Sequence, residues 1–163
     1  MDHGVRNLLP VGMTLLLVLL SALPTHLPGF AGIFPMLALI GVYYWAIYRP
    51  DLLPASMAFC IGLAQDMVMG TPLGVASLVY LLVQSMTASQ RKFFLGKPFL
   101  VAWSCFALMA LAAVLLTWLL CSMLFDHLLP LGPVLFETLM TIAVYPLLSW
   151  LFGRTHSALL SGV

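Results

Sequence analysis

Asp66 stands beside Gln65 inside a long apolar segment, FCIGLAQDMVMGTPLG (residues 59–74), which breaks at Gly70 and Pro72. A carboxylate is costly to bury in an apolar segment, so it needs hydrogen-bond donors, a proton or a partner. Three roles are open: an acceptor for hydroxyls or for the backbone N–H groups that open the next helix, a step in a proton or ion pathway, or a contact for a partner or ligand. We favour the first, in which the acid braces a helix–turn–helix.

Small residues share a helical face with this acid. Ala58, Gly62, Asp66 and Gly70 recur every four residues, which places them on one stripe of an α-helix. Stripes of small side chains let helix backbones approach closely. We therefore expect this face to pack against neighbouring helices and the carboxylate to point into the protein.

Glu137 is the second acid in an apolar segment, and Thr138 and Thr141 follow it. Its expected depth matches that of Asp66. An acid in the first turn of a helix is favoured by the macrodipole and can reach the outer surface. Alternatively, Glu137 and Asp66 face one cavity and bind a cation or an amine.

Arg49 and Pro50 join two apolar segments so briefly that a hairpin must form. The simpler interpretation is that Arg49 anchors the chain at the membrane surface while Pro50 ends a helix. The other interpretation is that this turn docks a cytoplasmic partner.

The sequence carries no signature of catalysis, metal binding or nucleic-acid binding. It has no HExxH, no glycine-flanked serine and no phosphate-cradling loop. Four histidines are scattered over termini and loops, and three cysteines have spacings of neither a zinc site nor a disulfide framework. The net charge of +1 gives no basic face for nucleic acid. We expect a protein that is not an enzyme and binds no cofactor, metal or nucleic acid.

Composition places these residues in a membrane protein. Of the 163 residues, 63% are hydrophobic and only 7% are charged, which is too little polar surface for a water-soluble globule. Division at charged, Pro and Gly clusters predicts a single all-α domain over residues 1–163 with six transmembrane helices. The predicted spans are 8–23, 33–48, 53–69, 73–89, 98–125 and 133–152. The aromatic residues that close the second span suit an interfacial belt.

Charge position predicts the topology. With six spans, every Lys and Arg falls on the same side of the membrane. The positive-inside rule then places both termini in the cytoplasm. The bases concerned are Arg6, Arg49, Arg91, Lys92, Lys97 and Arg154.

The runs PMLALIGVYYWAIYRP (residues 35–50) and AFCIGLAQDMVMGTPLG (residues 58–74) resemble the rod shape-determining MreD family of bacterial inner-membrane proteins. Length and six-span layout agree, although the second half of the chain matches by layout alone. The shared spacing is G-x-x-x-D-x-x-x-G-x-x-L-G. It is formed here by Gly62, Asp66, Gly70, Leu73 and Gly74.

The resemblance implies a multi-pass inner-membrane adaptor of the cell-elongation machinery, surrounded by membrane lipids. Such a protein binds MreC and links MreB filaments to the peptidoglycan synthase of RodA and its penicillin-binding transpeptidase. The family fold is similar to the substrate-binding component of energy-coupling-factor transporters. The alternative function is therefore the substrate-binding subunit of a small-molecule (vitamin-type) uptake transporter. For partner binding we expect the exposed sides of the first and second spans and the alanine face of the fifth (Ala107, Ala110, Ala113).

Overall fold

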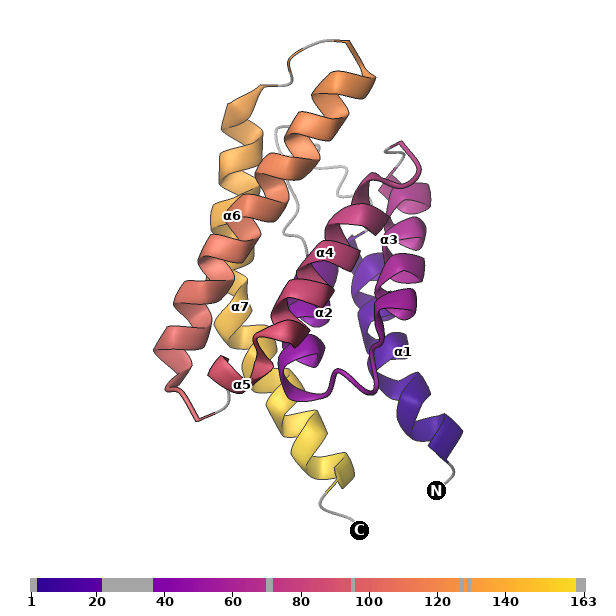
Figure 1. The fold of residues 1–163 in the computed structure, drawn as a ribbon, viewed down its shortest axis with the longest axis vertical. Coiled ribbons are helices and arrows are strands. Elements are labelled where there is room, and N and C mark those ends of the chain that lie inside the picture. Colours follow the sequence, from indigo (N-terminus) through magenta and orange to yellow (C-terminus); the bar gives the residue numbers. More distant parts are fainter. Residues whose placement is uncertain are drawn as a thin grey trace.

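The computed structural model describes residues 3–21, 37–69, 72–94, 96–126, 128 and 130–160. These residues form helices joined by short turns (Figure 1). The helices are α1 (His3–Ser21), α2 (Leu37–Tyr48), α3 (Ala55–Met69), α4 (Val75–Ser89), α5 (Arg91–Phe94), α6 (Phe99–Leu124) and α7 (Leu131–Leu160).

The helix bounds differ from the predicted spans mainly at the two ends of the chain. Helix α1 begins at His3 rather than at residue 8, and α7 continues to Leu160 rather than to residue 152. The short helix α5 was not predicted. The start of the second predicted span, residues 33–36, lies outside the described residues.

Two helices of the described chain, α6 and α7, are long and apolar enough to cross a bilayer. With 26 residues, α6 is about 39 Å long at 1.5 Å per residue. The apolar helices α2, α3 and α4 have 12 to 15 residues, or about 18 to 23 Å, against a hydrocarbon core of about 30 Å. The six-crossing topology therefore stays a prediction.

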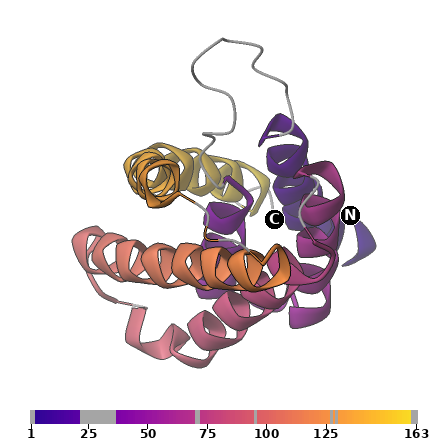
Figure 2. The ribbon, with the colours of Figure 1, turned by 90° about the horizontal axis from the view of Figure 1, so that it is seen from above.

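Helix α2 lies at the centre of the bundle. It contacts α1, α4 and α7, while α6 and α7 pack together on one side (Figures 1 and 2). Every residue of α2 from Leu37 to Ile47 is buried. The expectation that the second span offers an exposed side to a partner is wrong for these residues, because the neighbouring helices enclose them on every face.

Three of the four aromatic side chains of α2, those of Tyr43, Tyr44 and Trp45, lie in the core rather than in an interfacial belt, whereas Tyr48 at the end of the helix is exposed. Tyr43 makes edge-on ring contacts with Phe94, Phe106 and Tyr145, at centroid distances of 6.1, 5.0 and 5.8 Å. Its hydroxyl donates a hydrogen bond of 3.0 Å to the carbonyl of Ala102 in α6. Since a buried tyrosine needs such a partner, Tyr43 fixes α2 against α6.

The pairing of α6 with α7 compensates for a proline. Pro146 lies inside α7 and has no N–H to donate to the carbonyl of Ile142, four residues earlier. The indole Nε1 of Trp103 in α6 donates to that carbonyl at 3.1 Å. An interhelical bond thus replaces the missing bond within α7, as is required where no water is available.

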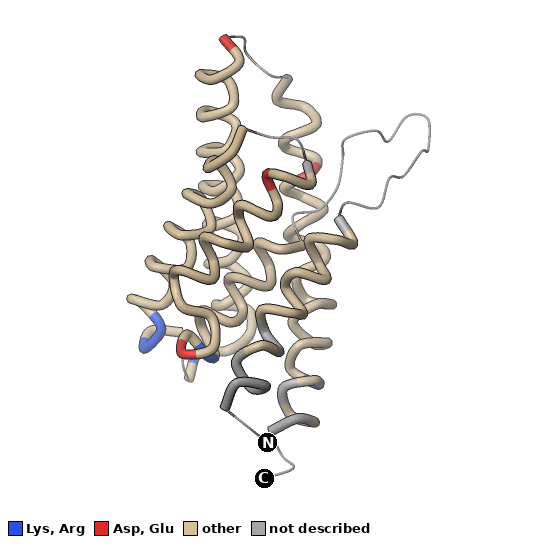
Figure 3. The backbone as a smooth tube through the Cα atoms, turned by 90° about the vertical axis from the view of Figure 1, so that its right-hand side faces the viewer, with Lys and Arg blue, Asp and Glu red and all other residues tan. Residues whose placement is uncertain are grey.

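Charged residues are separated along the bundle. The Lys and Arg segments visible in Figure 3 lie at one end, where α1 begins and α7 ends, and most of the Asp and Glu segments lie toward the other end. This arrangement agrees with the predicted grouping of the bases.

Candidate functional site

The Asp66 carboxylate lies over the first turn of α4 and is 1% exposed. Its Oδ2 accepts a hydrogen bond of 3.0 Å from the backbone N–H of Gly74. The N–H of Ala76 lies 3.2 Å from both carboxylate oxygens. These groups belong to the helix N-terminus, where N–H groups have no partner within the helix and the macrodipole favours an acid. A side chain of α3 therefore caps α4.

Gly62 lies one turn before Asp66, where the backbones of α3 and α4 approach each other. A Cβ at this position would collide with the Cα of Ser77 and lie 2.5 Å from its backbone nitrogen. Ala58, one turn earlier, is fully buried. The small stripe predicted from the sequence thus faces α4, although its last member, Gly70, lies outside the described residues.

The turn before α4 depends on the backbone of Gly74. Its φ angle of 103° lies in the left-handed region, which side chains with a Cβ disfavour. Pro72, half-buried, accepts the N–H of Val75 at 3.3 Å. The turn directs the N–H groups of Gly74 and Ala76 toward the carboxylate.

Tyr80 belongs to the buried face of α4. It is fully buried, and its hydroxyl has no hydrogen-bond partner. The ring lies within electrostatic range of both Glu137 and Asp66. The acids of α3 and α7 therefore both act electrostatically on one residue of α4, which the sequence interpretation did not include.

The sequence contains a pattern that could have identified Tyr80 as a buried polar residue. Polar side chains recur on one face of α4 at spacings of three, four and three residues, and all four are buried. In an apolar helix such spacing marks a face directed into the protein. The residues are Ser77, Tyr80, Gln84 and Thr87.

Glu137 is half-buried, in the second turn of α7. The neighbouring hydroxyls bond within the helix: Thr138 donates to the carbonyl of Val134, and Thr141 donates to the carbonyl of Glu137, both at 2.8 Å. Gln65 is also buried, and its Oε1 has no hydrogen-bond partner.

Away from the Asp66 site, a side chain of α4 and one of α5 bind the end of α2 and the turn that follows it. Gln84 Nε2 donates to the carbonyl of Leu53 at 3.1 Å. Arg91 Nε donates at 3.1 Å to the carbonyl of Ile47, in the last turn of α2. Both bonds satisfy backbone oxygens, and the second satisfies a carbonyl that the helix end leaves without a donor.

Arg49 and Pro50 form the turn itself. The N–H of Leu52 donates to the carbonyl of Arg49 at 3.1 Å, with Pro50 in the second position of the turn, where proline is favoured. Arg49 is half-buried, and its Nε has no hydrogen-bond partner. A hairpin forms here, as predicted from the sequence.

The polar side chains of this site hold neighbouring helices and turns together. Within the described parts of the chain, no three or more His, Cys, Asp or Glu residues lie close enough to hold a metal ion. The hydrogen bonds of Asp66, Gln84 and Arg91 described above each join a side chain to a backbone group of another element.

Comparison with known proteins identifies the family. A family model described as rod shape-determining protein MreD matches residues 4–154. No curated protein and no solved structure matches the chain. The family match includes α6 and most of α7, for which the sequence motifs gave only a similar layout. Because the match covers nearly the whole chain, the protein belongs to the MreD family of bacterial membrane proteins, which act in rod shape determination.

Proposed function

We propose that this chain is a non-enzymatic adaptor of the cell-elongation complex. In this role it binds MreC and links MreB filaments to the peptidoglycan synthase of RodA and its penicillin-binding transpeptidase. The observation that carries the proposal is the family match over residues 4–154. The internal use of polar groups supports it, since Asp66, Gln84 and Arg91 bind helix and turn backbones.

The adaptor would cross the inner membrane six times, with both termini in the cytoplasm. The gathering of Lys and Arg at the end where α1 begins and α7 ends supports this topology (Figure 3). Reporter fusions after residues 22, 50, 71, 95, 128 and 163 test it. Alternating outer and cytoplasmic signals with a cytoplasmic C-terminus are expected, and an odd number of crossings would contradict it.

The alanine face of the fifth span, which we expected to bind a partner, faces the inside of the protein in α6. Ala110 and Ala113 are buried within the protein, at 0% and 3% exposure. Small residues permit close packing, and here they pack α6 against its own bundle. The opposite face of α6 is an exposed leucine stripe. Its members are Leu108, Leu111, Leu115 and Leu119.

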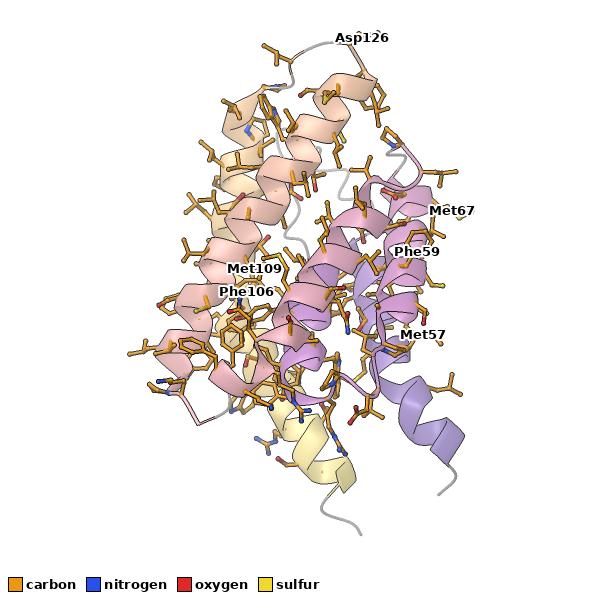
Figure 4. The ribbon with its side chains drawn as sticks, viewed as in Figure 1. Met57, Phe59, Met67, Phe106, Met109 and Asp126 are labelled. Carbon is orange, nitrogen blue, oxygen red and sulfur yellow. The ribbon has the colours of Figure 1, made fainter. Side chains whose placement is uncertain are left out.

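The family resemblance implies that MreC spans the membrane once, and we assign its transmembrane helix to this leucine stripe. Helices in lipid associate by packing along their length, so a full-length partner is best matched by a long helix. Helix α6 has 26 residues and contains no proline, whereas α7, with 30 residues, is interrupted by Pro146. Helix α3, whose Met57, Phe59 and Met67 point away from the bundle, has only 15 residues (Figure 4). Helix α6 can therefore accompany a crossing helix through the whole bilayer.

Photo-crosslinking in cells tests the assignment. A photo-reactive amino acid at Leu115 should capture MreC, while the same residue at Phe59 on α3 is the matched exposed control. Capture from Phe59 alone would move the interface to α3. Failure of MreC to copurify, or rod-shaped growth after clean deletion of the gene, would refute the adaptor function. A copurified small molecule held by Asp66 and Glu137 would instead favour the uptake-subunit alternative.

A further inference from the structure

Two adjoining hollows lie along α7 near the basic end of the bundle. The first has a volume of about 400 Å³ and is lined by Phe99, Pro146, Ser149 and Trp150. The second has a volume of about 480 Å³ and is lined by Trp150, Gly153, Arg154 and Ser157. Both are shallow, open depressions, and Trp150 lines both, so they adjoin along this face of α7 and are together called the groove.

The two halves of the groove differ in chemistry. In the first half Phe99 stacks on Tyr145, with a centroid distance of 6.0 Å and an interplanar angle of 16°. This half therefore has an aromatic wall and suits hydrocarbon.

The second half carries the exposed guanidinium of Arg154, which lies 5.3 Å from the centroid of the Trp150 ring. Ser157 donates its hydroxyl to the carbonyl of Gly153 at 2.9 Å. The guanidinium N–H groups of Arg154 are thus the charged donors of this half.

We propose that the groove binds an anionic phospholipid from the leaflet at the basic end of the bundle. An acyl chain lies in the half with Phe99 and Pro146, and the phosphate lies against Arg154, because a guanidinium matches a phosphate in geometry and charge. Pro146 and Arg154 are eight residues apart, or about 12 Å along a helix, so the groove runs from the acyl region to headgroup depth. Trp150 at the junction suits that boundary.

Charge complementarity selects a lipid over a neutral helix as the occupant. Lys97, two residues before Phe99, is exposed, as is Lys92 on α5, and both add positive charge at this end of the bundle. Basic groups at a membrane surface attract anionic lipid. A free phosphate would use only the half of the groove at Arg154 and leave the aromatic half empty.

Native mass spectrometry of the full-length protein in detergent tests the proposal. The protein is titrated with dioleoyl-phosphatidylglycerol and, as the neutral counterpart, with dioleoyl-phosphatidylcholine. We expect the wild type to retain the anionic lipid more tightly. Arg154→Gln should weaken its binding by about tenfold, the value of roughly one charge-assisted hydrogen bond, and Arg154→Lys should restore part of the loss. The matched control Lys92→Gln, which removes an equal charge outside the groove, should change binding less than about twofold.

Equal retention of the two lipids by the wild type would overturn the proposal. Equal losses of anionic-lipid binding in Arg154→Gln and Lys92→Gln would overturn it as well.

A second measurement, fluorescence quenching, does not depend on the arginine variants. Phosphatidylglycerol brominated on its acyl chains should quench the wild type more than Trp150→Phe, because the quenched indole lines the groove. Equal fractional quenching of these two proteins would refute the site. A photo-reactive amino acid at Leu147, on the exposed face of α7, gives one more test. If it captured a partner helix and the protein showed no preference for the anionic lipid, the proposed lipid site would also be refuted. The lipid titration uses purified protein without MreC, so its outcome is independent of the adaptor function.

Discussion

Replacement of Asp66 tests whether this acid braces α3 against α4. The carboxylate accepts the backbone N–H groups of Gly74 and Ala76 in a site that is 1% exposed. Asp66→Leu removes the acceptor and leaves two buried N–H groups without a hydrogen bond. Each unsatisfied group should lower the free energy of unfolding by about 1–3 kcal/mol, or about 2–6 kcal/mol in total. Asp66→Asn keeps one amide oxygen as an acceptor, so its expected cost is about 1–3 kcal/mol. Proteins are stable by only about 5–15 kcal/mol, and Asp66→Leu should therefore sharply lower the folded yield.

The assay measures monodisperse yield and the unfolding midpoint in detergent for wild type and both variants. Asp51→Asn is the matched control, because Asp51 is an exposed acid in the turn after α2 and its replacement should change stability by less than about 0.5 kcal/mol. Wild-type yield and midpoint for Asp66→Leu would refute the bracing role. If that variant also lost MreC binding at equal folded concentration, the carboxylate would be a partner contact instead.

Three further substitutions test other fastenings by the same unfolding midpoint. Gly62→Ala should destabilise the protein by about 1–3 kcal/mol, because the added methyl group would meet the backbone of α4. Gly12→Ala is the control and should be neutral or stabilising, because nothing lies within 4 Å of a Cβ there. Equal effects of the two substitutions would contradict the close approach of α3 and α4. Trp103→Phe should cost about 1–3 kcal/mol by leaving the Ile142 carbonyl without its donor, and an unchanged midpoint would mean that this carbonyl finds another. Gly74→Ala should cost about 1–2 kcal/mol from backbone conformation alone, since no atom lies within 4 Å of a Cβ there, and a neutral result would contradict the left-handed φ.

Much of the local architecture follows directly from the sequence. Apolar runs separated by Pro, Gly and charge give helices whose bounds lie close to those of α3, α4 and α6, because the same residues that end a bilayer span also interrupt helical hydrogen bonding. The four-residue repeat of Ala58, Gly62 and Asp66 identified the face of α3 that meets another helix. These features are local, so a single segment contains the information.

The arrangement of helices could not be obtained in this way. Lipid and protein core are equally apolar, so hydrophobicity does not distinguish the enclosed α2 from the edge helix α6. The alanines of α6 marked a packed face correctly, but the sequence does not say whether the neighbour is another protein or α6's own bundle. Tyr43 was likewise expected at the interface, although its ring contacts and its bond to Ala102 place it in the core.

Helix α4 holds the bundle together through buried residues that are separate from the proposed binding surfaces. Its first turn is held by Asp66 of α3, its buried face carries Tyr80 within electrostatic range of Asp66 and Glu137, and Gln84 holds the turn after α2. Substitutions on this face should therefore act on the folded yield of the whole bundle. The leucine stripe of α6 and the groove at Arg154 lie on exposed surfaces, where side chains contribute little to the core. Because the two sets of residues do not overlap, loss of partner or lipid binding at normal yield should map to the exposed faces of α6 and α7. Loss of yield should map to buried residues, such as those between α3 and α4 and Trp103 of α6.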